Sequence, residues 1–293
     1  MRRGAAGRGR RRSAPGPSPP PPRRGAPEKG LGGEHVEGRQ AVAELLAAGR
    51  RPVVDVWLDD STDPAPILDR IEELAATRRV PVRRVGRARL AAEARTDACQ
   101  GVLAHARPLP EADFDELCRS PGRRRGAAAA GAGAEEPPFL LALDGVTDPQ
   151  NLGALLRTAE AAGVTGVVLP RHRAVHITPA VTKAAAGAVE HVPIAVVGGL
   201  PASLSRATEL GMWVVGLDPS GPDSLFDLAV ADAGVVLVLG AEGRGLSRLV
   251  RQRCDTLVAI PLRGALPSLN VAAAGALALY EVARRRAGWG LDR

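Results

Sequence analysis

The sequence of 293 residues is poor in aromatic side chains, which make up 2% of it as three Trp, one Tyr and three Phe. Proteins that bind nucleic acid mainly by stacking bases need several aromatic rings along the binding surface. Base stacking therefore cannot be the main way in which this chain contacts a nucleic acid. The apolar fraction of 45% is carried by Ala, Val and Leu and suffices for a globular core.

Cysteine is also scarce. Cys99, Cys118 and Cys254 are odd in number and show no CxxC spacing, which excludes a disulfide framework and a zinc site of that type. No His/Cys/Asp cluster with the spacing of metal ligands is visible along the chain, so we expect no metal.

Long apolar runs are missing too, because none approaches the ~18 residues that span a bilayer. The basic N-terminus is followed by Pro-rich sequence and not by the apolar segment of a secretory signal. We expect a cytoplasmic protein that does not contact a membrane.

Positive charge is confined to one end of the chain. Residues 1–30 hold nine basic side chains and one acid, so the formal charge of +7 for the whole chain leaves −1 for the remainder. Residues 1–33 are rich in Arg, Gly, Ala and Pro, which predicts a disordered tail. Such a tail adds non-specific attraction for phosphate, whereas the folded part is not uniformly basic.

The pattern of apolar residues predicts two α/β domains joined by a linker. Residues 34–108 form the smaller domain, with helices at 38–48 and 67–78, a helical turn at 90–94, and strands at 53–58, 80–85 and 101–106. Residues 109–137 become rich in Gly, Ala and Arg and end in two prolines, which predicts a flexible linker with one helical turn at 114–118.

Residues 138–293 alternate regularly between strands and helices. The strands are rich in Val, Leu and Ile without alternation, which is typical of a mainly parallel sheet covered on both faces. The predicted strands are 139–143, 166–169, 192–197, 212–217, 235–239 and 257–261. The predicted helices are 151–162, 178–187, 200–210, 247–252 and 269–286.

Polar and glycine-rich motifs follow three of these strands. The first is Asp148-Pro149-Gln150-Asn151 with Arg157 further on. Capping by Asp148 and a proline at the first helical position explain its beginning. Neither explains Arg157, which needs an anionic or polar partner on a helix that otherwise packs leucines.

The second motif runs from Gly240 to Gly245 and contains Glu242, and glycines there let a ligand approach the backbone. The third, Ser268-Leu269-Asn270, opens a helix with a surface of small residues, although N-capping alone also explains Ser268 or Asn270. Loops after parallel strands meet at one edge of a sheet. We therefore expect these motifs to form one composite site.

Together the three motifs (DPQNLGALLR, LGAEGRG and IPLRGALPSLNV) resemble those of the SpoU (TrmH-like) branch of the SPOUT RNA methyltransferases. The segment GRQAV at 38–42 is similar to the corresponding segment of the bacterial members that methylate the ribose 2′-oxygen of a guanosine in 23S ribosomal RNA. The resemblance implies a trefoil-knotted, mainly parallel C-terminal sheet and a smaller N-terminal RNA-binding α/β domain. It also implies S-adenosyl-L-methionine as cofactor, and a homodimer whose active sites use residues from both subunits.

The same resemblance implies roles for individual residues. Those matching catalytic positions are Asn151, Arg157, Glu242, Ser268 and Asn270. Those matching cofactor-binding positions are Leu239, Gly240, Gly245, Ile260, Leu262 and Leu269. Because arginine stays charged, Arg157 is expected to orient a phosphate and stabilise the developing alkoxide while the 2′-oxygen attacks the methyl carbon.

Other functions stay open at this point. A nicotinamide-dependent dehydrogenase is a rival because of the GxxGxG pattern, but the acidic residue that would recognise a ribose is missing after a following strand. A non-catalytic RNA-binding or ribosome assembly factor and a transfer RNA methyltransferase of the same family are the further alternatives.

Overall fold

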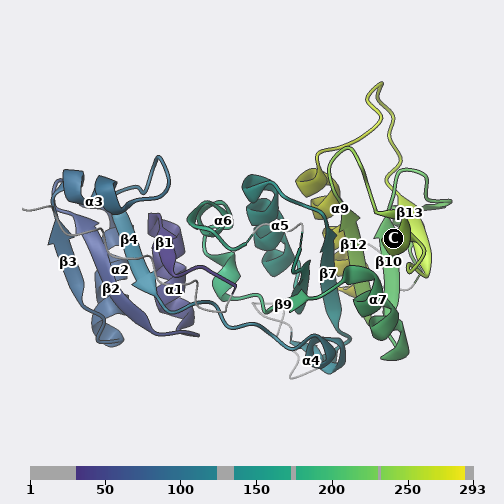
Figure 1. The fold of residues 1–293 in the computed structure, drawn as a ribbon, viewed down its shortest axis with the longest axis horizontal. Coiled ribbons are helices and arrows are strands. Elements are labelled where there is room, and N and C mark those ends of the chain that lie inside the picture. Colours follow the sequence, from purple (N-terminus) through teal and green to yellow (C-terminus); the bar gives the residue numbers. More distant parts are fainter. Residues whose placement is uncertain (1–30, 124–134, 173–175, 230–231, 288–293) are drawn as a thin grey trace, which may run out of the picture.

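The computed structural model describes residues 31–123, 135–172, 176–229 and 232–287. They form a smaller and a larger α/β region that lie side by side along the long axis of the molecule (Figure 1). The predicted tail at 1–30 lies outside the described residues. Within the described ranges, no helix has both the length and the apolar composition that crossing a bilayer requires.

The smaller region is a four-stranded sheet in the order β1-β4-β2-β3. Strands β2 and β3 are parallel, as the predicted βαβ unit requires. Strand β4, predicted at 101–106, lies antiparallel to both β2 and β1, and β1 was not predicted. The strands are β1 (His35–Glu37), β2 (Val53–Asp59), β3 (Val82–Val85) and β4 (Val102–Ala106).

Alternate residues of β4 pack on opposite faces of this sheet. Val102 and Ala104 face helices α1 and α2, while Leu103 faces Leu90 of helix α3. The helices are α1 (Arg39–Ala48), α2 (Pro66–Thr77) and α3 (Arg87–Glu93).

The larger region is a seven-stranded sheet in the order β11-β13-β10-β12-β7-β8-β9, and every neighbouring pair is parallel. The prediction of a mainly parallel sheet is thus confirmed. Its strands are β7 (Phe139–Asp144), β8 (Gly166–Pro170), β9 (Ile194–Val197), β10 (Trp213–Leu217), β11 (Asp223–Ser224), β12 (Val235–Gly240) and β13 (Thr256–Ala259).

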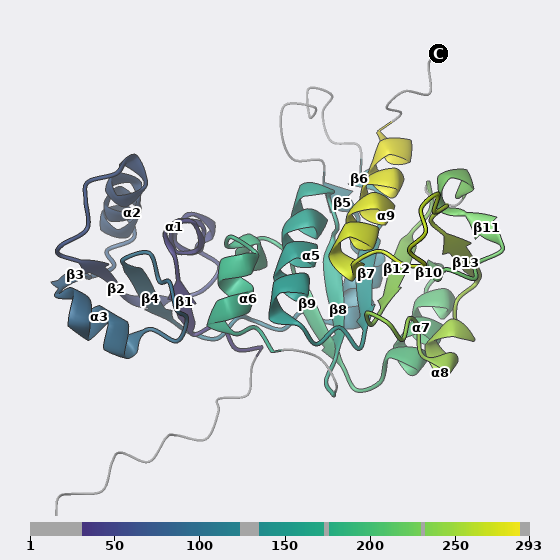
Figure 2. The same cartoon turned by 90° about the horizontal axis from the view of Figure 1, so that it is seen from above.

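Both faces of the larger sheet are covered. Leu141 of β7 packs into the core beneath α5, α6 and α9, while its neighbour Leu140 packs into the core beneath α4, α7 and α8 (Figure 2). Burial on two faces explains why these strands lack the polar alternation of a half-exposed sheet. The helices are α4 (Phe114–Arg119), α5 (Pro149–Ala161), α6 (Pro179–Ala184), α7 (Leu200–Glu209), α8 (Arg248–Arg251) and α9 (Val271–Arg286).

Helix α9 returns from β13, which lies next to the edge strand β11, to the middle of the sheet, where it lies beside α5 and β12 (Figure 2). Gly275 permits this approach, because a Cβ there would overlap the side chains of Leu155 and Leu239. A return across strands already in place is the path that a trefoil knot requires. The knot itself stays a prediction.

The structure differs from the sequence analysis at the ends of the expected linker and tail. Leu31, within the predicted tail, is 5% exposed and packs in the core of the larger region, and Gly32 pairs with Ile177. Leu117 and Cys118, within the predicted linker, are buried against the larger sheet. The first part of that segment is therefore packed, because its few apolar residues cover the side of β9, and residues 124–134 lie outside the described residues.

The two regions are joined by a buried ion pair. Arg51, before β2, contacts Glu190 of the 3-10 turn Ala188–Glu190 through Nη2–Oε1 at 2.5 Å and Nε–Oε2 at 3.0 Å. Both side chains are almost fully buried. His191 Nε2 lies 2.9 Å from Glu44 Oε2 beside this pair. These contacts hold the smaller region in a defined position against the larger one.

Candidate active site

The loops after β7, β12 and β13 lie at the carboxyl edge of the larger sheet because all its strands are parallel. Strand β8, the next in sequence after β7, lies on one side of β7, whereas the later strands β12 and β10 lie on the other side. The strand order therefore reverses at β7, where open α/β sheets bind ligands.

Asn270 begins helix α9 as its N-cap. Its Oδ1 accepts hydrogen bonds from the backbone N–H groups of Ala272 and Ala273 at 2.9 and 3.3 Å. Because only the oxygen can accept these bonds, the Nδ2 group must face away from the helix. It donates to Oδ1 of Asn151 at 2.9 Å. The end of the helix thus determines which amide atom Asn270 presents to the first motif.

Asn151 continues this chain of hydrogen bonds to the second motif. Since its Oδ1 accepts from Asn270, its Nδ2 is the donor, and it lies 3.3 Å from Oε2 of Glu242. Asp148 accepts from the backbone N–H of Asn151 at 2.7 Å, which confirms that Asp148 caps α5. Three of the five predicted catalytic residues, one from each motif, are therefore joined by side-chain hydrogen bonds.

The loop after β12 is folded tightly back on itself. Gly245 donates its backbone N–H to the carbonyl of Ala241 at 2.8 Å, and it has a positive φ of 64°. Gly240 lies directly beneath Gly245, so that any side chain at Gly240 would overlap the backbone of this loop. The backbone N–H of Ser247 donates to Oδ2 of Asp144 at 2.6 Å, which ties the loop to the end of β7.

The segment after β13 is exposed, and its backbone polar groups can contact a ligand. Residues 261–270 are all exposed, and within the described chain the backbone of residues 261–269 makes no hydrogen bond to another segment. Leu262 and Leu269 are each 40% exposed beside these unpaired groups. Free backbone donors and acceptors next to apolar side chains suit a mostly apolar, heterocyclic ligand with a few polar atoms.

The predicted cofactor positions border this segment. Leu239 is buried against Gly275, so only its backbone can serve a ligand. Ile260 is half-buried against the core at the start of the segment. These residues fit an adenosine-containing cofactor through backbone contacts, and that fit stays a prediction for each residue.

Two predicted catalytic residues lie outside the hydrogen-bonded chain. Ser268 is exposed in the segment before α9. Arg157 lies on α5 six residues after Asn151, which places it about 9 Å along the helix axis and on a different face. Its side chain is exposed and makes no hydrogen bond or ion pair within the described residues. Arg157 therefore makes no ion pair with Glu242 within the described residues.

Sequence reasoning missed two carboxylates at the same sheet edge. Asp144 ends β7 and holds the Ser247 loop. Asp218 follows β10 and lies 3.1 Å from Nη1 of Arg251. Burial acts to raise the pKa of Asp218, but hydrogen bonds from Ser220 and the charge of Arg251 hold it below its usual value. A polar residue directly after an apolar run was the signal for both.

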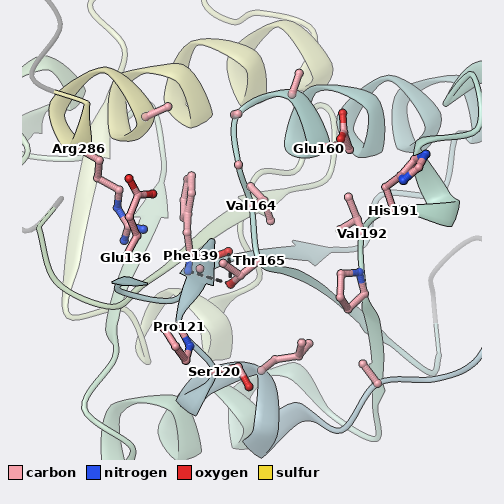
Figure 3. Close-up of a pocket in the computed structure, with 18 of the residues that line it drawn as sticks. Ser120, Pro121, Glu136, Phe139, Glu160, Val164, Thr165, His191, Val192 and Arg286 are labelled. Carbon is pink, nitrogen blue, oxygen red and sulfur yellow. Dashed lines mark hydrogen bonds between the residues drawn. The ribbon is translucent and has the colours of Figure 1, made fainter. Parts of the chain in front are cut away.

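A cavity of about 670 Å³ opens at the opposite, amino edge of the sheet (Figure 3). Phe139 and Thr165 lie at the strand starts that border it, and Glu136, Glu160 and Arg286 contribute charged groups. Its carboxylates disfavour an anionic ligand such as a phosphate. The motif residues do not line this cavity, so it carries no part of the candidate active site.

Comparison with known families agrees with this geometry. Residues 138–280 match the SpoU rRNA Methylase family, and residues 35–112 match the domain described as RNA 2'-O ribose methyltransferase substrate binding. The 23S rRNA (guanosine-2'-O-)-methyltransferase RlmB of Pseudomonas putida is 37% identical, and the match covers 86% of this chain and 97% of the relative. YacO of Bacillus subtilis, which is named for the TrmH family and for tRNA/rRNA, is 36% identical over 86% of this chain and 96% of its own.

Solved structures show the same likeness. The SpoU methyltransferase AviRb from Streptomyces viridochromogenes, in complex with AdoMet, superposes with a TM-score of 0.69 at 25% identity, covering 86% of this chain and 89% of AviRb. The chain therefore belongs to the SpoU rRNA methylase family. This membership confirms the predicted enzyme class and argues against the nicotinamide-dependent rival.

Proposed function

We propose that this protein transfers a methyl group from S-adenosyl-L-methionine to a ribose 2′-oxygen of RNA, and that its target is a guanosine of 23S ribosomal RNA. The observation that carries the proposal is the pair of hydrogen bonds that link Glu242 to Asn151 and Asn151 to Asn270. These bonds join three motifs at the carboxyl edge of the sheet. The RlmB relatives, named for this reaction, support the choice of guanosine and of 23S RNA.

S-adenosyl-L-methionine supplies an activated methyl carbon and a sulfur leaving group, so the protein has mainly to bind and align the reactants. The exposed segment 261–269 offers its backbone groups to the cofactor, and Leu262 and Leu269 cover its apolar parts. Gly240 and Gly245 let the neighbouring loop approach closely.

The hydrogen bonds between Glu242, Asn151 and Asn270 hold the three loops in fixed positions relative to one another. Asn270 and Asn151 fix the third motif to the first, and Glu242 fixes the second. Ser268 lies two residues before Asn270 and is exposed, so its hydroxyl can hold the ribose. An in-line displacement needs the 2′-oxygen, the methyl carbon and the sulfur in one line, and we expect loops held in this way to align them.

Arg157 acts, in this proposal, on the active site of a second copy of the chain. Its exposed guanidinium makes no hydrogen bond or ion pair within the described residues, and it lies off the face of α5 that carries Asn151. A homodimer also explains the apolar side chains left uncovered around α9, which are Leu266, Leu277 and Tyr280. Large exposed apolar patches mark interfaces.

In this proposal the protein is a cytoplasmic enzyme, and its smaller region binds the RNA beside the catalytic region. It matches the substrate-binding family model, and the buried pair of Arg51 and Glu190 fixes it to the catalytic region. Transfer RNA is the second candidate substrate, because the name of YacO covers both tRNA and rRNA.

Incubation of the full-length protein with methyl-labelled S-adenosyl-L-methionine and unmodified 23S RNA or transfer RNA tests the proposal. We expect a 2′-O-methylguanosine at one position of 23S RNA, detected by nuclease digestion and mass spectrometry, and no product with Asn151→Ala. Labelling of transfer RNA alone would refute the 23S assignment. Cofactor binding without labelling of either RNA would favour a non-catalytic assembly factor.

A further inference from the structure

A group of metal-ligating side chains gathers in the smaller region, far from the candidate active site. His35 of β1 and His105 of β4 are direct cross-strand partners, and Glu93 ends α3 above them. One ligand atom from each of the three residues lies within 4.8 Å of the other two. The imidazole rings stand edge to face with centroids 5.3 Å apart.

His35 has a ring nitrogen without a hydrogen-bond partner at a buried position. Its side chain is 3% exposed, and Nδ1 has no hydrogen-bond partner within the described residues. Nε2 has a polar neighbour, Oε1 of Glu37 at 2.9 Å. Burying an unpaired polar group is costly, so such a group calls for a ligand.

His105 is oriented as ligating histidines usually are. Its Nδ1 lies 2.7 Å from Oδ1 of Asp55, and its Nε2 lies 3.4 Å from Oε1 of Glu93. Asp55 is held in turn by Nε1 of Trp57 at 3.0 Å and by Nε of Arg83 at 3.2 Å. A carboxylate on one ring nitrogen fixes the tautomer and directs the lone pair of the other nitrogen outward, which is the common outer-shell arrangement of protein metal sites.

Charges of both signs surround the group. The carboxylates of Glu37, Asp55 and Glu93 lie near it, and so do the guanidinium groups of Arg83, Arg89 and Arg95. Glu37 is further occupied by the backbone N–H groups of residues 95 and 96. Glu93 is the carboxylate left to balance a bound ion.

We propose that His35, Glu93 and His105 bind a divalent cation of the zinc type, with Asp55 as the outer partner of His105. Two imidazoles and a carboxylate are a ligand set that suits zinc, and a water can complete the tetrahedron. Tetrahedral ligands at about 2.0–2.1 Å from an ion lie about 3.4 Å apart, so the group must contract. Glu93 can make that movement because its side chain is 41% exposed at the end of its helix.

The bound ion would link β1, β4 and α3, which share this face of the sheet. Helix α3 carries Arg87 and Arg89 as exposed residues, and Arg89 lies over the ring of Trp57 at 5.1 Å. The ion therefore fixes basic side chains on a domain of the substrate-binding type. No residue of the candidate active site takes part, so this site and the proposed methyl transfer can be tested separately.

Full-length protein is stripped with a chelator and titrated with Co²⁺ and then with Zn²⁺. We expect a visible Co²⁺ spectrum of tetrahedral intensity at one equivalent per chain, bleached by Zn²⁺, and one retained zinc after dialysis. Glu93→Gln should weaken zinc binding at least tenfold, and Asp55→Asn should weaken it by a similar factor through loss of the outer partner. His172→Gln, which removes an exposed histidine outside the group, should bind like the unmodified protein.

Two results would overturn the proposal. One is an unmodified protein that retains no more zinc than Glu93→Gln does, which would leave the group as a hydrogen-bonded network only. The other is equal loss of zinc in His172→Gln, which would mean surface chelation. Glu93 is exposed enough for its variant to fold, and far-ultraviolet circular dichroism of each variant verifies that it has.

Discussion

Single side chains in the candidate site serve the fold and the proposed chemistry with different atoms. The oxygen of Asn270 caps α9, and its amide nitrogen holds Asn151. N-capping and a catalytic role were competing explanations of the third motif, and the structure shows that the cap uses the oxygen of Asn270 while the nitrogen contacts the first motif. The two roles can therefore be separated by a substitution that keeps the oxygen and removes the nitrogen.

Asn270→Asp should retain stability and lose activity. A carboxylate caps a helix as well as an amide does and interacts favourably with the helix dipole, but it cannot donate to Asn151. Asn270→Ala should lose activity and also about 1 kcal/mol of stability. Thermal unfolding and methyl transfer by both variants provide the measurement. Equal destabilisation by Asp and Ala would contradict the assignment of the cap to the oxygen.

Arg157→Ala should abolish methyl transfer while leaving S-adenosyl-L-methionine binding, measured by calorimetry, nearly unchanged. If the guanidinium serves the partner subunit, mixing Arg157→Ala with Asn151→Ala restores one intact site in each mixed dimer. Random exchange of subunits then recovers about a quarter of the full activity. Mixtures that stay inactive, although the subunits exchange, would place Arg157 in the site of its own chain.

At the scale of elements, close packing of α9 against α5 and β12 positions the third motif. Gly275 is the contact point, because Leu155 and Leu239 leave no room for a Cβ. The small residues of this helix permit close packing, but the sequence alone leaves open whether they face a cofactor or another subunit. The structure shows that Gly275 faces its own chain.

Gly275→Val should lower the free energy of unfolding by about 1–3 kcal/mol, because it overpacks a buried contact. Ala273→Val introduces the same side chain at an exposed position of α9 and should cost only about 0.5–0.7 kcal/mol of helix propensity. Chemical denaturation of both variants makes the comparison. A loss in Gly275→Val no larger than that in Ala273→Val would show that the contacts with Leu155 and Leu239 do not set the requirement for glycine.

At the scale of the whole molecule, a buried ion pair decides how the two regions are joined. Breaking a buried pair by removing one charge costs about 3–5 kcal/mol, because the other charge remains buried without compensation. Arg51 also donates to the backbone carbonyls of Gly33 and Arg107, so its guanidinium is fixed in place and cannot turn to solvent.

Glu190→Gln should therefore destabilise the protein by about 3 kcal/mol. Glu209→Gln breaks an exposed pair with Arg206 and should change stability by less than about 1 kcal/mol. Differential scanning calorimetry of the two variants compares them directly. A loss in Glu190→Gln no larger than in Glu209→Gln would show that the regions are held together by other contacts.

The local pattern of apolar and polar residues predicted much of the architecture. Apolar runs and their spacing predicted the parallel sheet, because strands buried on both faces need Val, Leu and Ile at every position. The pattern missed β1, since three residues from His35 to Glu37 show no period. It also assigned Leu117 to a linker, because the Gly/Ala/Arg-rich stretch that follows outweighed a short apolar turn.

The sequence by itself determined the family, the order of the motifs and the residue types that the proposed chemistry needs, because these depend on short segments with their own local signature. Only the tertiary structure decided which of those residues meet. It joined Asn151, Glu242 and Asn270, placed Arg157 on another face of its helix, and brought His35 opposite His105. The physical reason is that such contacts depend on sheet register and helix rotation over long separations along the chain, and no single stretch of sequence contains them.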